Sequence, residues 1–263
     1  MKKWLRISLI ILFSAVFLVS GYMLLDYFLE SKKQASTFDE LAGMVAAGSS
    51  VTQPLEPTIP VEPEESAAPT EPQPLPEYIE VSALNEDMVG WMRIDDTKIN
   101  YPVMQTPDNP DYYLHTDFYG KYTIHGCLYA EEDCDINLPS DNITIYGHHM
   151  GDGSMFAGLM KYKNKSYWEE HRYITFDTLT EHHTYEIFAV FTTTATKGKG
   201  FTYHHFINAE RPEDFETFVS DCRELSLYDT GIVPTYGDKL ITLSTCEYSQ
   251  KNGRLVVVAV RID

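Results

Sequence analysis

The chain has 263 residues, with 39 aspartates and glutamates against 20 lysines and arginines and a formal net charge of −19 at pH 7. A chain this acidic is repelled by the phosphates of DNA and RNA, so the composition argues against a nucleic acid partner. The four cysteines are too few to hold a chain of this length together as a disulfide framework. Because the composition differs between segments of the chain, domains are assigned segment by segment.

The N-terminus predicts a single-pass membrane anchor. Residues 1–6 carry three basic side chains, and residues 7–25 follow without a charge, which is long enough to cross a bilayer as a helix. A cleaved signal peptide is the alternative, but this run exceeds the usual apolar region of a signal peptide and no small-residue cleavage site follows it. The positive-inside rule places residues 1–6 in the cytoplasm and the rest of the chain outside the cell, although Lys32 and Lys33 weaken the asymmetry.

The next segment has the composition of a spacer. Residues 34–92 contain eleven acidic side chains and no lysine or arginine, and residues 54–76 contain eight prolines. Such a sequence cannot bury a core, and it favours extended, self-repelling chain. We therefore predict an acidic, Pro-rich extracellular stalk over residues 26–77, followed by one folded domain over residues 78–263.

The folded domain begins with a predicted helix and continues mostly as strands. Apolar residues at helical spacing predict a capping helix over residues 78–92. Short apolar, β-branched or aromatic runs then lie between polar turns, at 90–94, 99–104, 126–130, 143–146, 173–178, 183–194, 239–245 and 254–262. Two helical insertions are predicted at 154–168 and at 213–227, the second with Pro212 at its start. The pattern predicts a mainly antiparallel β-barrel or β-sandwich with added helices.

Three of the cysteines and two pairs of histidines show no metal-binding pattern. Cys127 and Cys134 could close a small loop as a disulfide or remain free thiols, and both alternatives stay open. Cys222 lies in a predicted helix, where a small buried apolar role is expected. The histidine pairs at 182–183 and 204–205 lack the spacing of a helical zinc site, so we expect neither a metal nor a cofactor.

Three polar residues mark the ends of predicted strands. The strand at 239–245 ends on Cys246, and the next strand begins at Arg254, so a thiol and a guanidinium should share one rim of the sheet. A cation near a cysteine favours the nucleophilic thiolate. His148 ends another strand and could act as a general base and acid. The alternatives are a buried structural cysteine, a surface arginine, and His149 in place of His148.

Five motifs together carry a resemblance to a known family. They are Thr242-Leu-Ser-Thr-Cys246, Arg254-Leu-Val-Val-Val-Ala, Tyr146-Gly-His148-His149-Met, Asp152-Gly-Ser-Met-Phe156 and Val89-Gly-Trp-Met-Arg-Ile94. In this combination, residues 84–263 resemble class B sortases. The resemblance implies a closed eight-stranded sortase-type β-barrel with an N-terminal helix, and it makes residues 78–263 the catalytic domain.

The resemblance also implies an activity. Class B sortases are membrane-anchored cysteine transpeptidases on the outer face of Gram-positive-type cells, and their catalytic residues correspond here to Cys246, His148 and Arg254. Such an enzyme cleaves the C-terminal sorting signal of a surface protein after Thr and holds the product as a thioacyl intermediate. An amine of peptidoglycan, of its precursor or of a pilin then takes the acyl group. The expected partners are therefore sorting-signal-bearing proteins, that amine and the membrane.

Further positions match the family's substrate groove. Ser244 matches a groove position two residues before the cysteine, and Leu114, Thr194 and an aromatic residue, either Phe201 or Tyr203, match others. We take Tyr203 as the aromatic residue of the groove.

One position departs from the family's pattern. Some relatives have an acidic residue two positions after the cysteine, whereas Tyr248 stands there in this chain and Glu247 precedes it. An essential acidic partner for the histidine is therefore not expected. Two other functions remain open from the sequence, an extracellular cysteine peptidase that passes the acyl group to water and an anchored binding domain without chemistry.

Overall fold

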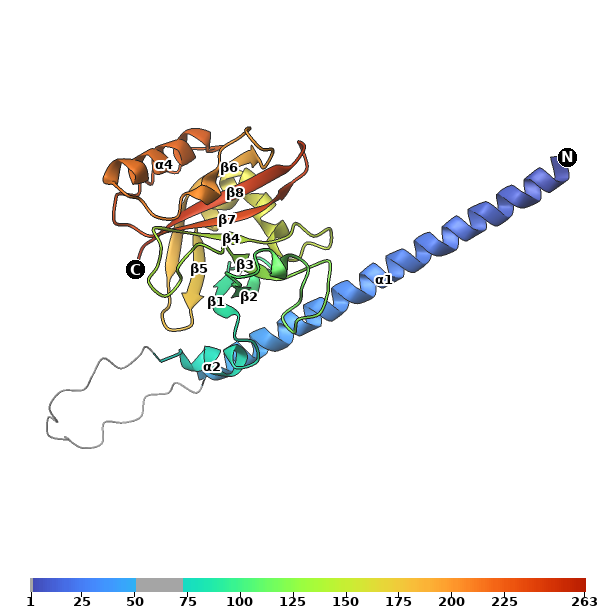
Figure 1. Cartoon of the computed structure of the whole chain (residues 1–263), viewed down its shortest axis with the longest axis horizontal. Helices are drawn as coiled ribbons and strands as arrows, with labels where there is room; N and C mark the ends of the chain where they lie inside the picture. Colours follow the sequence, from blue (N-terminus) through green and yellow to red (C-terminus); the bar gives the residue numbers. More distant parts are fainter. Residues whose placement is uncertain (1, 51–72) are drawn as a thin grey trace, which may run out of the picture.

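The computed structural model describes residues 2–50 and 73–263, and it shows a β-barrel beside one long helix (Figure 1). The long helix, α1 (Lys2–Ser50), is followed among the described residues by the short helix α2 (Pro76–Ser82). The prolines predicted to extend the stalk lie largely between these helices, and residues 51–72 are outside the described residues.

All eight predicted strands are present. They are β1 (Met88–Arg93), β2 (Asn100–Met104), β3 (Leu128–Ala130), β4 (Asn142–Tyr146), β5 (Tyr173–Thr178), β6 (Thr184–Thr194), β7 (Leu240–Glu247) and β8 (Gly253–Arg261). They close in the order β1-β2-β3-β4-β7-β8-β6-β5, which confirms the predicted eight-stranded barrel. The pairs β2–β3 and β4–β7 are parallel and the other six neighbouring pairs are antiparallel, so the barrel is mixed but mainly antiparallel, as predicted.

The barrel wall separates two apolar clusters because side chains alternate between the faces of each strand. On β8, Leu255, Val257 and Ala259 pack in the barrel interior. The intervening Val256 and Val258 pack outward against helix α4 (Pro212–Leu225). Burial on both faces explains why β7 and β8 read as continuous apolar runs in the sequence.

Helices are present in the predicted regions, but their bounds differ from those predicted. The insertion at 154–168 is a 3-10 helix, η2 (Phe156–Lys163), followed by α3 (Lys165–Glu170), and two one-turn 3-10 helices, η1 (Tyr112–Leu114) and η3 (Tyr203–His205), complete the elements. The helix predicted over 78–92 is wrong in its second half, which forms β1. The helix α2 ends at Ser82, and the side chain of Ile79 on it is 54% exposed.

The stalk predicted over residues 26–77 needs a correction at its start. Residues 26–50 continue α1 as helix and pack along the barrel. Phe38 and Leu41 are buried, and the ring of Phe38 lies 4.7 Å from that of Tyr101 on β2. This segment therefore docks on the barrel through an apolar stripe of an amphipathic helix.

The four cysteines are all free. Cys127 and Cys134 are buried, and burial raises the pKa of the Cys134 thiol to about 11. Cys222 is buried among the apolar side chains between α4 and the barrel, as predicted. The open alternative of a Cys127–Cys134 disulfide is therefore resolved in favour of two free thiols.

Candidate active site

Cys246 and Arg254 are direct neighbours across β7 and β8. The two residues are register partners in an antiparallel ladder, so their side chains leave the sheet on the same face. Leu255, the next residue of β8, points into the barrel interior, which places Cys246 and Arg254 on the outer face. Both side chains are partly exposed. The predicted pairing of a thiol with a permanent cation at one rim is therefore present.

His148 follows the end of β4, the strand that neighbours β7. The strand β4 runs parallel to β7 with Tyr146 opposite Ser244, and the Gly147 amide continues this pairing by donating to the Ser244 carbonyl at 3.2 Å. Cys246 is two residues further along β7, and His148 lies two residues beyond Tyr146, where β4 ends. The parallel register thus brings together two residues that are almost a hundred positions apart in the sequence.

Gly147 is required for this approach because its surroundings leave no room for a side chain. A Cβ at Gly147 would lie 2.5 Å from the side chain of Leu128 and 2.7 Å from that of Phe156. The chain therefore passes close to the packed core immediately before His148, and a larger residue would push this turn outward.

The orientation of His148 is held by a backbone contact. Its Nε2–H donates to the Leu114 carbonyl at 2.7 Å, because a carbonyl oxygen can only accept. This bond leaves Nδ1 as the nitrogen available to exchange a proton. Burial is the largest influence on the pKa of His148 and lowers it, and the nearby His115 and His125 add to this effect, while the Leu114 carbonyl opposes it.

His149 has a different position from His148. Its Nδ1–H donates to the backbone carbonyl of Cys246 at 3.1 Å, and its ring lies 5.2 Å from that of Tyr248. The contact of His149 is therefore with the main chain of the cysteine. Among the described residues, no hydrogen bond joins either imidazole to the Cys246 thiol.

The predicted groove residues fall into two groups. Ser244 shares the outer face of β7 with Cys246, and its hydroxyl lies 2.6 Å from that of Tyr203, so the structure brings these two together. Burial raises the pKa of Tyr203. Leu114 reaches the site through its carbonyl, which accepts from His148.

Thr194 does not lie on the face of the sheet that carries Cys246 and Arg254. It is the partner of Gly253, whereas Thr193 is the partner of Arg254 and shares the side of the sheet with it. The hydroxyl of Thr194 donates to the Lys251 carbonyl at 3.0 Å. The register thus adds Thr193 to the site, a residue that the sequence could not distinguish from its neighbour within a run of three threonines.

Glu247 is engaged away from both histidines. Its carboxylate accepts from Lys163 of η2 at 2.7 Å and from the Ser249 amide at 3.0 Å, and its pKa is lowered chiefly by the bond from Lys163. Glu247 is 4% exposed and points to the opposite face from Cys246. The contact with Lys163 was not anticipated, since it joins a residue of an irregular insertion to a strand.

The other histidine pairs lie outside this site or at its margin. His182 contacts the carboxylates of Glu77 at 3.1 Å and Asp177 at 3.0 Å, which ties α2 to β5. His204 belongs to η3, beside Tyr203. Within residues 2–50 and 73–263, no group of three or more His, Cys, Asp or Glu side chains is arranged to hold a metal ion.

Known proteins of one family are similar to this chain. Residues 92–262 match the model of the sortase domain family. The chain is 31% identical to sortase B of Listeria monocytogenes over 260 residues, which covers 97% of this chain and 96% of the relative. The chain belongs to the sortase B family. Sortase B of Staphylococcus aureus is also similar, with 28% identity over 263 residues covering 98% of this chain and 97% of the relative.

The solved structures of sortase B extend the likeness to three dimensions. A Staphylococcus aureus sortase B–substrate complex has a TM-score of 0.75 to this chain at 26% identity, and the match covers 89% of this chain and 99% of that one. The resemblance seen in the sequence motifs is thereby confirmed for family and fold. As a sortase B, the chain is a cysteine transpeptidase, so the alternative of a binding domain without chemistry no longer applies.

Proposed function

We propose that Cys246 is the nucleophile of this transpeptidase, that His148 is its general acid and base, and that Arg254 stabilises the negative charge that develops during the reaction. The observation that supports this assignment is that Cys246 and Arg254 are register partners on β7 and β8, while His148 follows the end of β4, the strand that runs parallel to β7. Arg254 is a fixed cation beside the thiol, which favours the thiolate before substrate arrives.

The proposed reaction has two acyl transfers. The Cys246 thiolate attacks the carbonyl carbon of the Thr residue in a sorting signal, and Arg254 stabilises the resulting oxyanion. The C–N bond then breaks, His148 gives a proton to the departing amine, and a thioester to Cys246 remains. In the second transfer, an acceptor amine attacks the thioester, passes a proton to His148 and releases the thiolate.

The sorting signal lies, in this proposal, along the outer face of β7 beside Ser244 and Tyr203. The relative crystallised with its substrate supports a binding groove on this fold. The paired hydroxyls of Ser244 and Tyr203 can bond to a peptide backbone in an extended conformation. The acceptor is an amine of peptidoglycan, of its precursor or of a pilin.

Membrane anchoring completes the proposal. The helix α1 is long and apolar enough to cross a membrane, and its first half makes no burying contact with the barrel. We assign residues 1–6 to a cytoplasmic tail, residues 7–25 to the membrane span and residues 78–263 to an extracellular catalytic domain. The protein would then be a single-pass enzyme of the cell membrane that acts on its outer side.

The test uses the full chain in nanodiscs with peptides bearing LPXTG-like, SPXTG-like and NPXTN-like motifs. The reaction products are measured by mass spectrometry with and without an added amine. We expect cleavage after Thr, an acyl group on Cys246 and a ligated product that appears only with the amine. Release of the free acid alone, at the same rate with and without amine, would instead establish a cysteine peptidase that transfers to water.

A further inference from the structure

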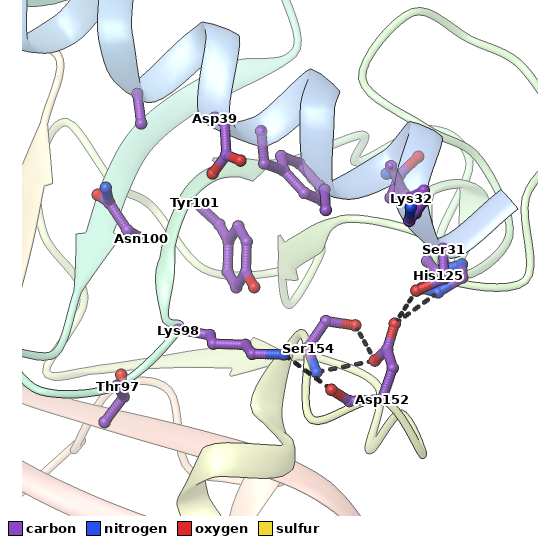
Figure 2. A pocket seen from close by; sticks show the side chains of 14 residues that line it. Ser31, Lys32, Asp39, Thr97, Lys98, Asn100, Tyr101, His125, Asp152 and Ser154 are labelled. Carbon is purple, nitrogen blue, oxygen red and sulfur yellow. Dashed lines mark hydrogen bonds and ion pairs between the residues drawn. The ribbon is translucent and has the colours of Figure 1, made fainter. Parts of the chain in front are cut away.

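The segment of α1 that follows the predicted membrane span contacts loops at one end of the barrel. The ring of Tyr27 stacks on His125 at 6.1 Å, and the Glu30 carboxylate accepts from the Ile124 amide at 3.1 Å. Ser31 donates to Asp152, four residues after His148 (Figure 2). Three positions of α1 within five residues therefore contact two loops of the barrel, and one of these loops follows His148.

The same stretch of α1 marks the level of the bilayer surface. Exposed apolar side chains continue along the helix as far as Phe28 and Leu29, which are 53% and 56% exposed. Lys32 and Lys33 follow within four residues of Leu29, where long cationic side chains meet the headgroups of a membrane. The barrel contacts thus begin at the depth where the apolar segment ends, with no spacer between them.

The barrel end at this level is the one that carries Cys246. The strands β4 and β7 are parallel, so both end on the side where Asp152 meets α1. In Figure 1 the hairpin between β7 and β8 projects toward the N-terminal half of α1, whereas the opposite end of these strands lies beside the C-terminus. The candidate active site therefore faces the membrane-spanning part of the helix.

Two loops at this end of the barrel, residues 195–200 and 248–252, are basic although the whole chain is acidic. The sequence contains no aspartate or glutamate over residues 187–209 or over residues 248–262. Lys197, Lys199 and Lys251 are exposed in the two loops concerned, and no ion pair with an acidic group is found for them among the described residues. The loops are joined, because the Ala195 amide donates to the Asn252 carbonyl at 2.9 Å.

We propose that the loops at residues 195–200 and 248–252 contact anionic lipid headgroups, so that the barrel end bearing Cys246 rests on the outer surface of the bilayer. The inference depends on the proposed membrane anchoring but not on the catalytic roles of Cys246, His148 and Arg254. Each lysine near an anionic leaflet gains favourable electrostatic energy, and α1 holds the loops at the required depth. Substrates would then be taken up beside the membrane.

The test measures lysine acetylation in the full chain by mass spectrometry. The protein is placed in nanodiscs of phosphatidylcholine alone or of phosphatidylcholine with phosphatidylglycerol, and a water-soluble acetylating reagent is added. We expect Lys199 and Lys251 to react about fivefold more slowly in the anionic nanodiscs. Lys239 begins the opposite end of β7, where it pairs with Asp141 at 2.9 Å, and should react equally in both.

Two charge-matched double variants complete the design. In Lys199→Gln/Lys251→Gln, the remaining Lys197 should lose its protection, because two of the three cations are gone. In Arg211→Gln/Arg223→Gln, which removes the same charge from α4, the protection of Lys197 should persist. The proposal would be overturned if Lys251 were acetylated at the same rate in both lipids, or if the anionic lipid protected Lys239 as strongly as Lys251. Neither result depends on whether the enzyme is active.

Discussion

The hydroxyls of Tyr203 and Ser244 lie 2.6 Å apart, joining η3 to β7 on the face that carries Cys246. Tyr203 is 4% exposed and Ser244 is 2% exposed, so each hydroxyl depends on the other for a hydrogen bond. Removal of either one leaves a buried polar group without its partner, which costs about 1–3 kcal/mol.

Tyr203→Phe and Ser244→Ala test whether this pair also contacts the substrate. If it only supports the fold, each change should lower the melting temperature and leave kcat/KM unaltered for the folded enzyme. We expect instead that kcat/KM falls about five- to tenfold, mainly through KM. The double variant should lose less than the product of the two single effects, because the residues act as a unit.

Cys246→Ala should abolish both cleavage and ligation while the melting temperature changes by only a few degrees. The side chain is partly exposed and makes no hydrogen bond of its own among the described residues, so its removal leaves little cavity. The matched control is Cys134→Ala, which removes a buried thiol far from the proposed chemistry and should retain turnover. Ligated product from Cys246→Ala would refute the assignment.

Arg254→Lys should lower kcat by about 10²–10³, because a point charge replaces a planar group that is positioned beside the oxyanion. Arg261→Lys offers a control on the same strand, since Arg261 lies at the other end of β8 near Asp263. Single-turnover kinetics would measure the first acyl transfer directly. Equal rates for the two variants would remove Arg254 from the mechanism.

Glu131 gives a pH dependence of stability. Burial raises the pKa of this carboxyl to about 7, despite the hydrogen bond from the Tyr146 hydroxyl. The unfolded chain loses this proton at a lower pH than the folded protein does, so stability should fall as pH rises from about 4.5 to about 7. Glu131→Gln should therefore raise the melting temperature at pH 8 relative to the natural protein and have little effect at pH 4.

Gly147→Ala should destabilise the protein by about 1–3 kcal/mol, because the new methyl group meets Leu128 and Phe156 within 3 Å. It should also reduce kcat, since the turn before His148 must shift. Gly151→Ala is the control in the same loop, because the nearest atom to its Cβ would be 3.7 Å away. Chemical denaturation and steady-state kinetics of both variants would separate the two effects.

The strands and the reactive side chains could be predicted from the sequence, but the pairing of the strands could not. Strand positions follow from local alternation and apolar runs, and the thiol, imidazole and guanidinium stand out at strand ends. The parallel pairing of β4 with β7, which brings the strand before His148 beside the strand that carries Cys246, joins segments almost a hundred residues apart and has no local signal. The distinction between Thr193 and Thr194 depends on the same kind of register.

The helical part of the predicted stalk could not be recognised for a related reason. Acidic composition and the absence of lysine and arginine over residues 34–50 describe the exposed face of that helix, while Phe38 and Leu41 on its other face are few in number. Their burial depends on the surface of the barrel, including Tyr101. Tertiary packing therefore decided the structure of a segment whose composition favoured extended chain.

The distribution of the cysteines has a consequence for oxidation. Three of the four thiols are buried, and burial raises the pKa of each of them, whereas Cys246 is partly exposed. Oxidants and alkylating reagents attack accessible thiolates, so their damage should be confined to one sulfur atom. Outside a reducing cytoplasm, that single atom would determine the working lifetime of the enzyme, and alkylation of one equivalent would count the active molecules in a preparation.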